Sequence, residues 1–154
     1  MPREVTPVKR GYCGIGIWYP SKEVNVGTLF RSALALDADF VFTIGRRYSR
    51  QSSDTPNTTK HLPYYHYESF EDFKKNRPKG ARLVCVEITE GARDLRSFCH
   101  PEQAIYLLGS EGGGLPAELL GNNIVVKIPS QTCLNVSSAG TVTLYDRLAK
   151  RGAN

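Results

Sequence analysis

The sequence predicts an α/β protein with a mostly parallel sheet and helices on both faces of that sheet. Short apolar segments, each about the length of a buried strand, alternate with segments whose apolar residues recur at helical spacing. Strands that alternate with helices favour parallel pairing, because each crossover helix covers one face of the sheet. The 154 residues show no internal repeat, linker or low-complexity stretch. We therefore expect a single domain over residues 1–154.

The first half of the chain predicts two strands around a helix. Residues 12–19 alternate enough for a first strand, which Pro20 ends. Residues 25–36 place apolar side chains at helical spacing, with Asn25 as the expected N-cap. Residues 40–44 predict a short buried strand. Residues 46–64 are polar and contain two prolines, so they predict a long loop.

The second half continues the alternation. Ser69 is the expected N-cap of a short helix, and the last helix ends in basic residues that suit its C-terminal dipole. The expected strands cover residues 64–67, 82–88, 104–108 and 124–128, and the expected helices or helical turns cover residues 69–76, 95–98, 116–120 and 136–150.

Composition excludes several classes of protein. Hydrophobic residues make up 40% of the chain and charged residues 23%, which is typical of a soluble globular protein. No apolar run approaches the roughly 18 residues of a membrane helix, and the first ten residues lack a signal-peptide core. We expect a cytoplasmic protein that does not bind a membrane.

The four cysteines form no CxxC pair, which argues against a metal site and a disulfide framework. Cys13, Cys85 and Cys99 lie in or beside apolar segments, where a reduced cysteine packs as a small hydrophobe. Cys133 differs because it falls in a polar loop. We expect no bound metal.

The charge of the chain favours an anionic partner. Twenty basic residues against fifteen acidic ones give a formal net charge of +5. Many soluble proteins are equally basic without binding an anion, so local density is the stronger signal. Residues 45–50 contain three arginines and a tyrosine, and arginine both forks onto phosphates and stacks on bases. We expect RNA contacts at Arg46, Arg47 and Arg50, with residues 64–67 as a further candidate and a second basic cluster at residues 74–79.

Two loops near the C-terminus predict a cleft in which main-chain groups hold a ligand. Residues 107–116 (LLGSEGGGLP) lead a buried strand into a glycine-rich turn, and residues 128–140 (IPSQTCLNVSSAG) form a polar loop that opens a helix. The glycines are followed by Leu-Pro and no GxGxxG occurs, so neither a P-loop nor a dinucleotide fingerprint is present. A general nucleotide-binding module is thereby disfavoured. The three histidines are isolated, and no hydrolase triad or metal cluster stands out.

Three segments together resemble the three motifs of the SpoU/TrmH branch of the SPOUT RNA methyltransferases. Residues 25–31 (NVGTLFR) resemble the first motif, marked by an asparagine and an arginine six residues apart at a helix start. Residues 108–116 resemble the second motif. Residues 128–129 and 133–135 resemble the third motif, which usually ends in Ser-Leu-Asn. Order and spacing agree over nearly the whole chain.

The resemblance implies a C-terminal deep trefoil knot and S-adenosylmethionine held in a bent form by the main chain of three loops. Glycines and strand ends free of bulky side chains suit such backbone contacts. The residues implied to contact the cofactor are Glu87, Leu108, Gly109, Gly112, Gly113, Ile128, Cys133 and Leu134. Cys133 stands where the family usually has serine, so a serine-type hydrogen bond would be weaker here.

The resemblance also implies methyl transfer to a ribose 2′-hydroxyl of RNA. Arg31 matches the catalytic arginine of the family, with Asn25, Glu111 and Asn135 shaping the site around it. A guanidinium stays protonated, so Arg31 acts either as the base assigned in related enzymes or as a group that positions phosphate and stabilises an alkoxide.

The chain resembles the minimal single-domain members of the family, in which a homodimer forms the RNA surface. We expect tRNA as the substrate. Ribosomal RNA and a non-catalytic RNA-binding protein that keeps the fold are the alternatives. Labelled methyl transfer to bulk RNA separates the catalytic from the non-catalytic interpretation.

Overall fold

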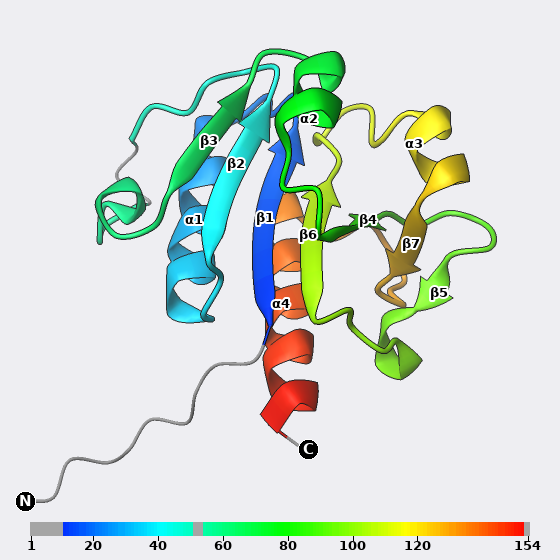
Figure 1. Ribbon diagram of the computed structural model, residues 1–154. Helices are drawn as coiled ribbons and strands as arrows, with labels where there is room; N and C mark the ends of the chain where they lie inside the picture. The colour runs from blue at the N-terminus through cyan, green and yellow to red at the C-terminus, as the bar shows by residue number, and fades with distance from the viewer. Residues whose placement is uncertain (1–10, 51–53, 153–154) are drawn as a thin grey trace, which may run out of the picture.

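The computed structural model describes residues 11–50 and 54–152. They form one seven-stranded sheet with helices packed on it (Figure 1). The strands are β1 (Tyr12–Trp18), β2 (Phe40–Ile44), β3 (Tyr64–Tyr67), β4 (Arg82–Val86), β5 (Arg93–Asp94), β6 (Gln103–Leu108) and β7 (Ile124–Lys127). The α-helices are α1 (Glu23–Ala35), α2 (Phe70–Asn76), α3 (Ala117–Asn122) and α4 (Val136–Gly152), and short 3-10 turns occur at Thr58–Lys60 and Leu95–Ser97.

The sheet confirms the predicted fold class. Its strand order is β3-β2-β1-β6-β4-β7-β5, and neighbouring strands pair in parallel throughout. The strands β1, β6, β4 and β7 therefore end at the same edge. In open α/β sheets this carboxyl edge is where ligands bind.

Helices cover both faces of the sheet, as the sequence predicts. Alternate residues of β1 point to opposite faces, so Ile15 and Ile17 join one core while Gly14 and Gly16 leave room on the other face for Phe40 and Phe42. The core with Ile15 includes Leu29 of α1 and other residues of α1 and α4. The opposite core includes residues of α2 and α3. Figure 1 shows α1 and α4 behind the sheet and α2 in front of it.

Two expectations about local structure differ from what the structure shows. Asn25 is not an N-cap: α1 begins at Glu23, Lys22 occupies the N-cap, and no side chain caps this end. Asn25 is instead buried, because its amide has tertiary partners described below. The two-residue strand β5, which pairs with β7 at the edge of the sheet, was not expected. Strands this short carry no periodicity.

The C-terminal end of α4 is fixed by Arg147 more than by the helix dipole. Arg147 is 6% exposed and donates to the carbonyl oxygens of Pro101 (2.6 Å) and Glu102 (2.7 Å) and to the hydroxyl of Tyr106 (3.1 Å). Lys150 donates to the Leu95 carbonyl at 2.6 Å. Together these bonds set the position of α4 along the sheet, and hence the place where its N-terminus meets the carboxyl edge.

The long loop after β2 is organised by a buried carboxylate. Asp54 is fully buried and accepts hydrogen bonds from the Tyr48 hydroxyl (2.9 Å), the Thr58 amide (2.9 Å) and the Thr58 hydroxyl (2.7 Å). A buried carboxylate is tolerated when it is hydrogen-bonded in this way. The segment that carries the three arginines is therefore anchored on both sides of Arg50.

The four cysteines differ in exposure. Cys13 and Cys85 are buried, whereas Cys99 and Cys133 are exposed, so the expectation that Cys99 packs as a small hydrophobe is wrong.

In the part of the chain that the structure describes, none of the helices combines the length and the apolar character needed to span a membrane.

Candidate active site

A cavity of about 560 Å³ opens at the carboxyl edge of the sheet. It lies beyond the ends of β6, β4 and β7 and is closed by the first residues of α1 and α4. Its volume falls in the range of roughly 300–1000 Å³ typical of small-molecule sites. Its lining consists of Lys22, Asn25, Val86, Glu87, Ile88, Leu108, Gly109, Ser110, Glu111, Gly112, Gly113, Gly114, Ile128, Ser130, Cys133, Leu134, Asn135, Val136 and Ala139.

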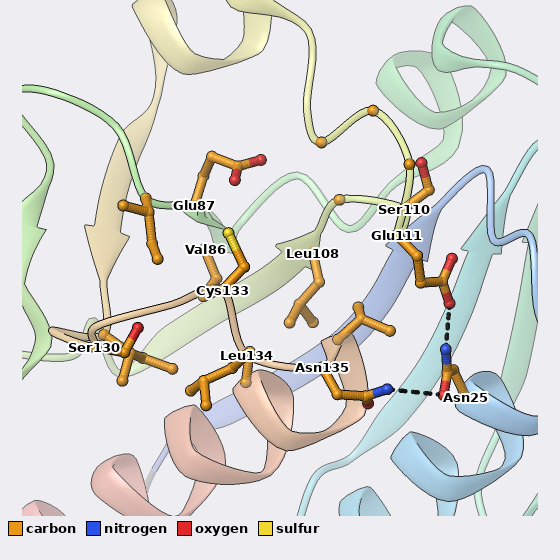
Figure 2. Close-up of a pocket in the computed structure, with 18 of the residues that line it drawn as sticks. Asn25, Val86, Glu87, Leu108, Ser110, Glu111, Ser130, Cys133, Leu134 and Asn135 are labelled. Carbon is orange, nitrogen blue, oxygen red and sulfur yellow. Dashed lines mark hydrogen bonds between the residues drawn. The ribbon is translucent and has the colours of Figure 1, made fainter.

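A continuous chain of hydrogen bonds crosses one wall of this cavity. Asn25 donates from Nδ2 to Glu111 Oε1 at 2.6 Å, and Asn135 donates from Nδ2 to Asn25 Oδ1 at 3.2 Å. Figure 2 shows Asn25 between the two partners, while Cys133 is drawn on the Glu87 side of the cavity. Asn25 thus uses both ends of its amide to join the loop after β6 to the loop before α4. We call Glu111, Asn25 and Asn135 the polar triad.

Each end of the polar triad is fixed by a further contact. Asn135 immediately precedes α4, and its Oδ1 accepts from the amide (2.9 Å) and hydroxyl (2.6 Å) of Ser137, which is the bonding of an N-cap. At the other end, Glu111 Oε2 accepts from the Ser21 hydroxyl at 2.6 Å. Arg46 Nη1 in turn donates to the Ser21 carbonyl oxygen at 2.8 Å. Ser21 therefore connects the polar triad to the basic loop after β2.

The carboxylate of the polar triad is ionised at neutral pH. Burial raises the pKa of Glu111, but the hydrogen bonds from Ser21 and Asn25 together outweigh burial and hold that pKa below the ordinary 4.5. With both oxygens occupied by donors, Glu111 is a weak base. Its chemistry suits it to hold neighbouring groups rather than to accept a proton.

The glycine-rich turn is shaped by close backbone contacts. A Cβ atom on Gly109 would lie 2.6 Å from the Gly114 Cα, and Gly114 itself has φ +64°. Glu87 packs against this turn and accepts from the Leu115 amide at 3.0 Å. A Cβ on Gly112 or Gly113 would meet nothing within 4 Å, so these two glycines leave open space over the cavity.

Comparison with known proteins identifies the family. Residues 15–145 match the profile of the SpoU rRNA Methylase family. The chain belongs to this family. Among SpoU relatives, tRNA (guanosine(18)-2′-O)-methyltransferase TARBP1 of Mus musculus is 31% identical over 77 residues. That match covers 47% of this chain and only 5% of the mouse protein.

Solved structures share the SpoU fold. The SpoU methyltransferase AviRb from Streptomyces viridochromogenes, in complex with the cofactor AdoMet, has a TM-score of 0.82 at 24% identity, over 96% of this chain and 64% of AviRb. A protein studied for the 2-OH methylation of C/U34 on tRNA has a TM-score of 0.80 at 24% identity, over 94% of this chain and 99% of its own. The C-terminal knot expected from the resemblance is implied by this shared fold.

The structure brings together most of the residues that the sequence singled out. Three of the four residues with an expected catalytic role line the cavity as the polar triad. The eight residues with an expected cofactor contact all line the same cavity: Glu87, Leu108, Gly109, Gly112, Gly113, Ile128, Cys133 and Leu134. Segments separated by 86 and 110 residues therefore meet at one place, as the SpoU motifs predict.

Arg31 and Arg50 lie apart from this arrangement. Arg31 is exposed and does not line the cavity, because six residues along α1 turn it away from the face that carries Asn25. Arg50 donates to the carbonyl oxygens of Asp54 and Thr55, each at 3.4 Å, and so lies along its own loop. Arg46 and Arg47 are both exposed, and Arg46 contacts Ser21 beside the polar triad.

Sequence reasoning missed Ser21 and Lys22. Ser21 bonds Glu111 through its amide and its hydroxyl, and Lys22 lines the cavity. Both residues follow the carboxyl end of β1, and that position is the signal that could have found them.

Replacing Asn25 by aspartate tests the polar triad. Asn25→Asp places an oxygen where Nδ2 now lies, 2.6 Å from Glu111 Oε1. We expect the free energy of unfolding at pH 7 to fall by roughly 1–3 kcal/mol, because two carboxylates then oppose each other and a donor is removed. Urea unfolding measures this change, with Gln103→Glu, an exposed amide-to-carboxylate change at the start of β6, as the control.

The same variant should also change how the free energy of unfolding depends on pH. In the native chain the lowered pKa of Glu111 contributes stability above pH 4.5, which is lost as the pH falls through the folded value. In Asn25→Asp one carboxyl pKa is raised instead, so the variant recovers stability relative to the native chain as the pH approaches 4.5. Equal unfolding free energies at pH 7 would show that the bond between Asn25 and Glu111 is unimportant.

Proposed function

We propose that this protein transfers a methyl group from S-adenosylmethionine to a ribose 2′-hydroxyl of RNA. The observation that carries this proposal is the polar triad, which joins three motif segments of a SpoU family member around one cavity. The family supports RNA methyl transfer, and the 2′-O-methyltransferase activity of the mouse relative supports the 2′-oxygen as the acceptor.

The cavity fits the expected cofactor. Residues 108–114 line it, together with Ile128, Ser130 and residues 133–135, and the glycine turn leaves open space where side chains would intrude. Val86, Leu108 and Ile128 give it apolar walls. When bound, S-adenosylmethionine supplies a methyl group on a sulfonium, which needs no further activation. The residues that would hold it are those of the glycine turn, the 128–135 loop and the strand end at Glu87.

The chain contributes positioning and electrostatics. Asn25 and Asn135 hold the loop after β6 and the loop before α4 in a fixed arrangement. The rate of a direct methyl transfer depends strongly on such alignment. Glu111 stays ionised with both oxygens occupied, so the acceptor hydroxyl passes its proton to solvent water. Arg31 keeps its proton at any ordinary pH. We propose that its guanidinium stabilises the developing alkoxide and the adjoining phosphate.

We propose tRNA as the substrate. Support comes from the mouse relative, a tRNA 2′-O-methyltransferase, and from the likeness to the protein studied for C/U34 methylation on tRNA, which this chain matches nearly end to end. Ribosomal RNA is the second candidate, because the family is described by rRNA methylation.

We propose a homodimer whose interface involves α1 and α4. These two helices pack against each other, yet three large apolar side chains on them are exposed: Val24, Val142 and Tyr145. Exposed apolar surface of this kind marks interaction sites. Val24 and Arg31 are seven residues apart and share one face of α1. A partner on this face would place Arg31 at the subunit boundary, beside a cavity that it does not line within the single chain.

Methyl transfer is the direct test of the proposed activity. Bulk tRNA is incubated with the protein and labelled S-adenosylmethionine and then digested to nucleosides. We expect label in 2′-O-methylnucleosides. Arg31→Ala should lower the rate about 10²–10³-fold with unchanged affinity for S-adenosylhomocysteine, whereas Arg82→Ala, an exposed arginine at the start of β4, should have little effect. Ribosomal RNA is assayed in parallel. Label in base-methylated nucleosides, or no label in either RNA, would contradict the proposal.

The basic loop predicts a particular salt dependence of RNA binding. Replacing Arg46 and Arg47 by alanine should reduce the slope of log affinity against log salt by about 0.7–0.9 for each phosphate that these arginines neutralise. Lys74→Ala is the control, because Lys74 already pairs with Glu71 at 3.0 Å and covers the Phe70 ring. An unchanged slope in the double variant would show that Arg46 and Arg47 do not neutralise RNA phosphates.

Sedimentation equilibrium tests the dimer. We expect twice the 17.1 kDa of one chain, and a shift towards one chain in Tyr145→Asp, because that change puts a charge on the most exposed of the apolar side chains. Tyr65→Asp, at an exposed tyrosine on β3, is the control. A native mass of one chain would contradict the dimer.

A further inference from the structure

Tyr19 holds a backbone conformation that aromatic residues rarely adopt. Its φ is 43°, and the other described non-glycine residues with positive φ are Asp37 and Asn57. Aspartate and asparagine tolerate this region through local hydrogen bonds, whereas tyrosine gains nothing comparable. The Tyr19 amide donates to the Ile44 carbonyl at 2.8 Å, which ties this conformation to the end of β2. Strain of this kind clusters at ligand-binding positions.

The ring of Tyr19 packs against the backbone of Gly45. A Cβ atom on Gly45 would lie 2.3 Å from the Tyr19 ring carbons Cδ1 and Cε1, so only glycine lets the ring settle there. Trp18 braces the ring edge-on, with 4.9 Å between centroids. Even so, Tyr19 remains 45% exposed. An immobilised aromatic ring is thus presented to solvent rather than used to fill a core.

The position of this ring links the basic loop to the polar triad. Tyr19 is two residues from Ser21, which bonds Glu111. Gly45, under the ring, is followed by Arg46, whose guanidinium donates to the Ser21 carbonyl. Arginine binds phosphate, and the face of a fixed aromatic ring stacks on an unpaired base. The two functions occur side by side at the edge of the candidate active site.

We propose that Tyr19 is a stacking platform for an unpaired base of the substrate RNA. This inference rests on the proposed function, since it names the part of the substrate that the site recognises next to the reacting ribose. Tyr19 acts as a binding residue, with Gly45 as the support that keeps its ring in place and Arg46 as the neighbouring phosphate contact. Because every base has a π-face, the platform favours a flipped-out nucleotide over a particular base.

The test compares side chains that differ in ring character. Tyr19→Leu keeps apolar bulk without a ring, Tyr19→Phe keeps the ring without the hydroxyl, and Tyr19→Gly accepts the positive φ should the leucine variant fold poorly. Tyr12→Leu is the matched control, because Tyr12 is partly exposed, stacks on Phe40 and lies at the opposite end of β1 from Tyr19. Filter binding of bulk tRNA, calorimetry with S-adenosylhomocysteine, sedimentation and the KM and kcat of methyl transfer are measured for each.

We expect the leucine and glycine variants to bind tRNA between about fivefold and about 150-fold more weakly, with KM raised to a similar extent. The phenylalanine variant and the Tyr12 control should match the native protein, and S-adenosylhomocysteine affinity should not change. Native tRNA affinity in the leucine and glycine variants would overturn the platform, as would equal losses in the phenylalanine and leucine variants. Dissociation of the dimer in step with weaker RNA binding would also overturn it, by making Tyr19 a subunit contact.

The proposed function and the platform can fail separately. Ring-dependent tRNA binding without any methyl transfer would contradict the function and support the platform. Methyl transfer that is indifferent to the ring would support the function and overturn the platform. A native protein that binds no tRNA would overturn both.

Discussion

The hydrogen bonds from Asn25 to Glu111 and from Asn135 to Asn25 are the constraint on which the site depends. They join residues 86 and 110 positions apart in the sequence. Asn25 is suited to this place because its amide carries a donor at one end and an acceptor at the other. An aspartate could not donate to Glu111, and an apolar residue would leave the Glu111 carboxylate without one of its donors. The relative position of the loops that Asn25 joins therefore depends on side-chain chemistry as well as on the fold.

The fold brings these three residues to the same place. Parallel strands end at one edge, so the loops after β6 and β7 meet there, and α1 and α4 pack on the same face with their N-termini directed towards it. Arg147 and Lys150 fix the far end of α4, and Asn135 caps its near end. The polar triad therefore couples the packing of the sheet to the shape of the cavity.

Sequence reasoning reached the sheet and the cavity because both depend on local signals. Apolar runs identify buried strands, and the glycine content of residues 107–116 identifies the turn. It failed where tertiary contacts decide. Asn25 has the residue type of an N-cap, yet its amide is engaged by Glu111 and Asn135 instead. Arg31 is a different case: helix geometry turns it away from the cavity of the single chain, and its catalytic role stays a prediction. The exposed ring of Tyr19 has no periodic signal at all.

A structure of the protein bound to S-adenosylhomocysteine would show whether the polar triad shapes the cofactor site. We expect the ligand in the 560 Å³ cavity, held by the main chain of residues 108–114 and 128–135, with the bonds among Glu111, Asn25 and Asn135 intact. A ligand bound outside this cavity, or bound there only after those bonds are broken, would contradict it.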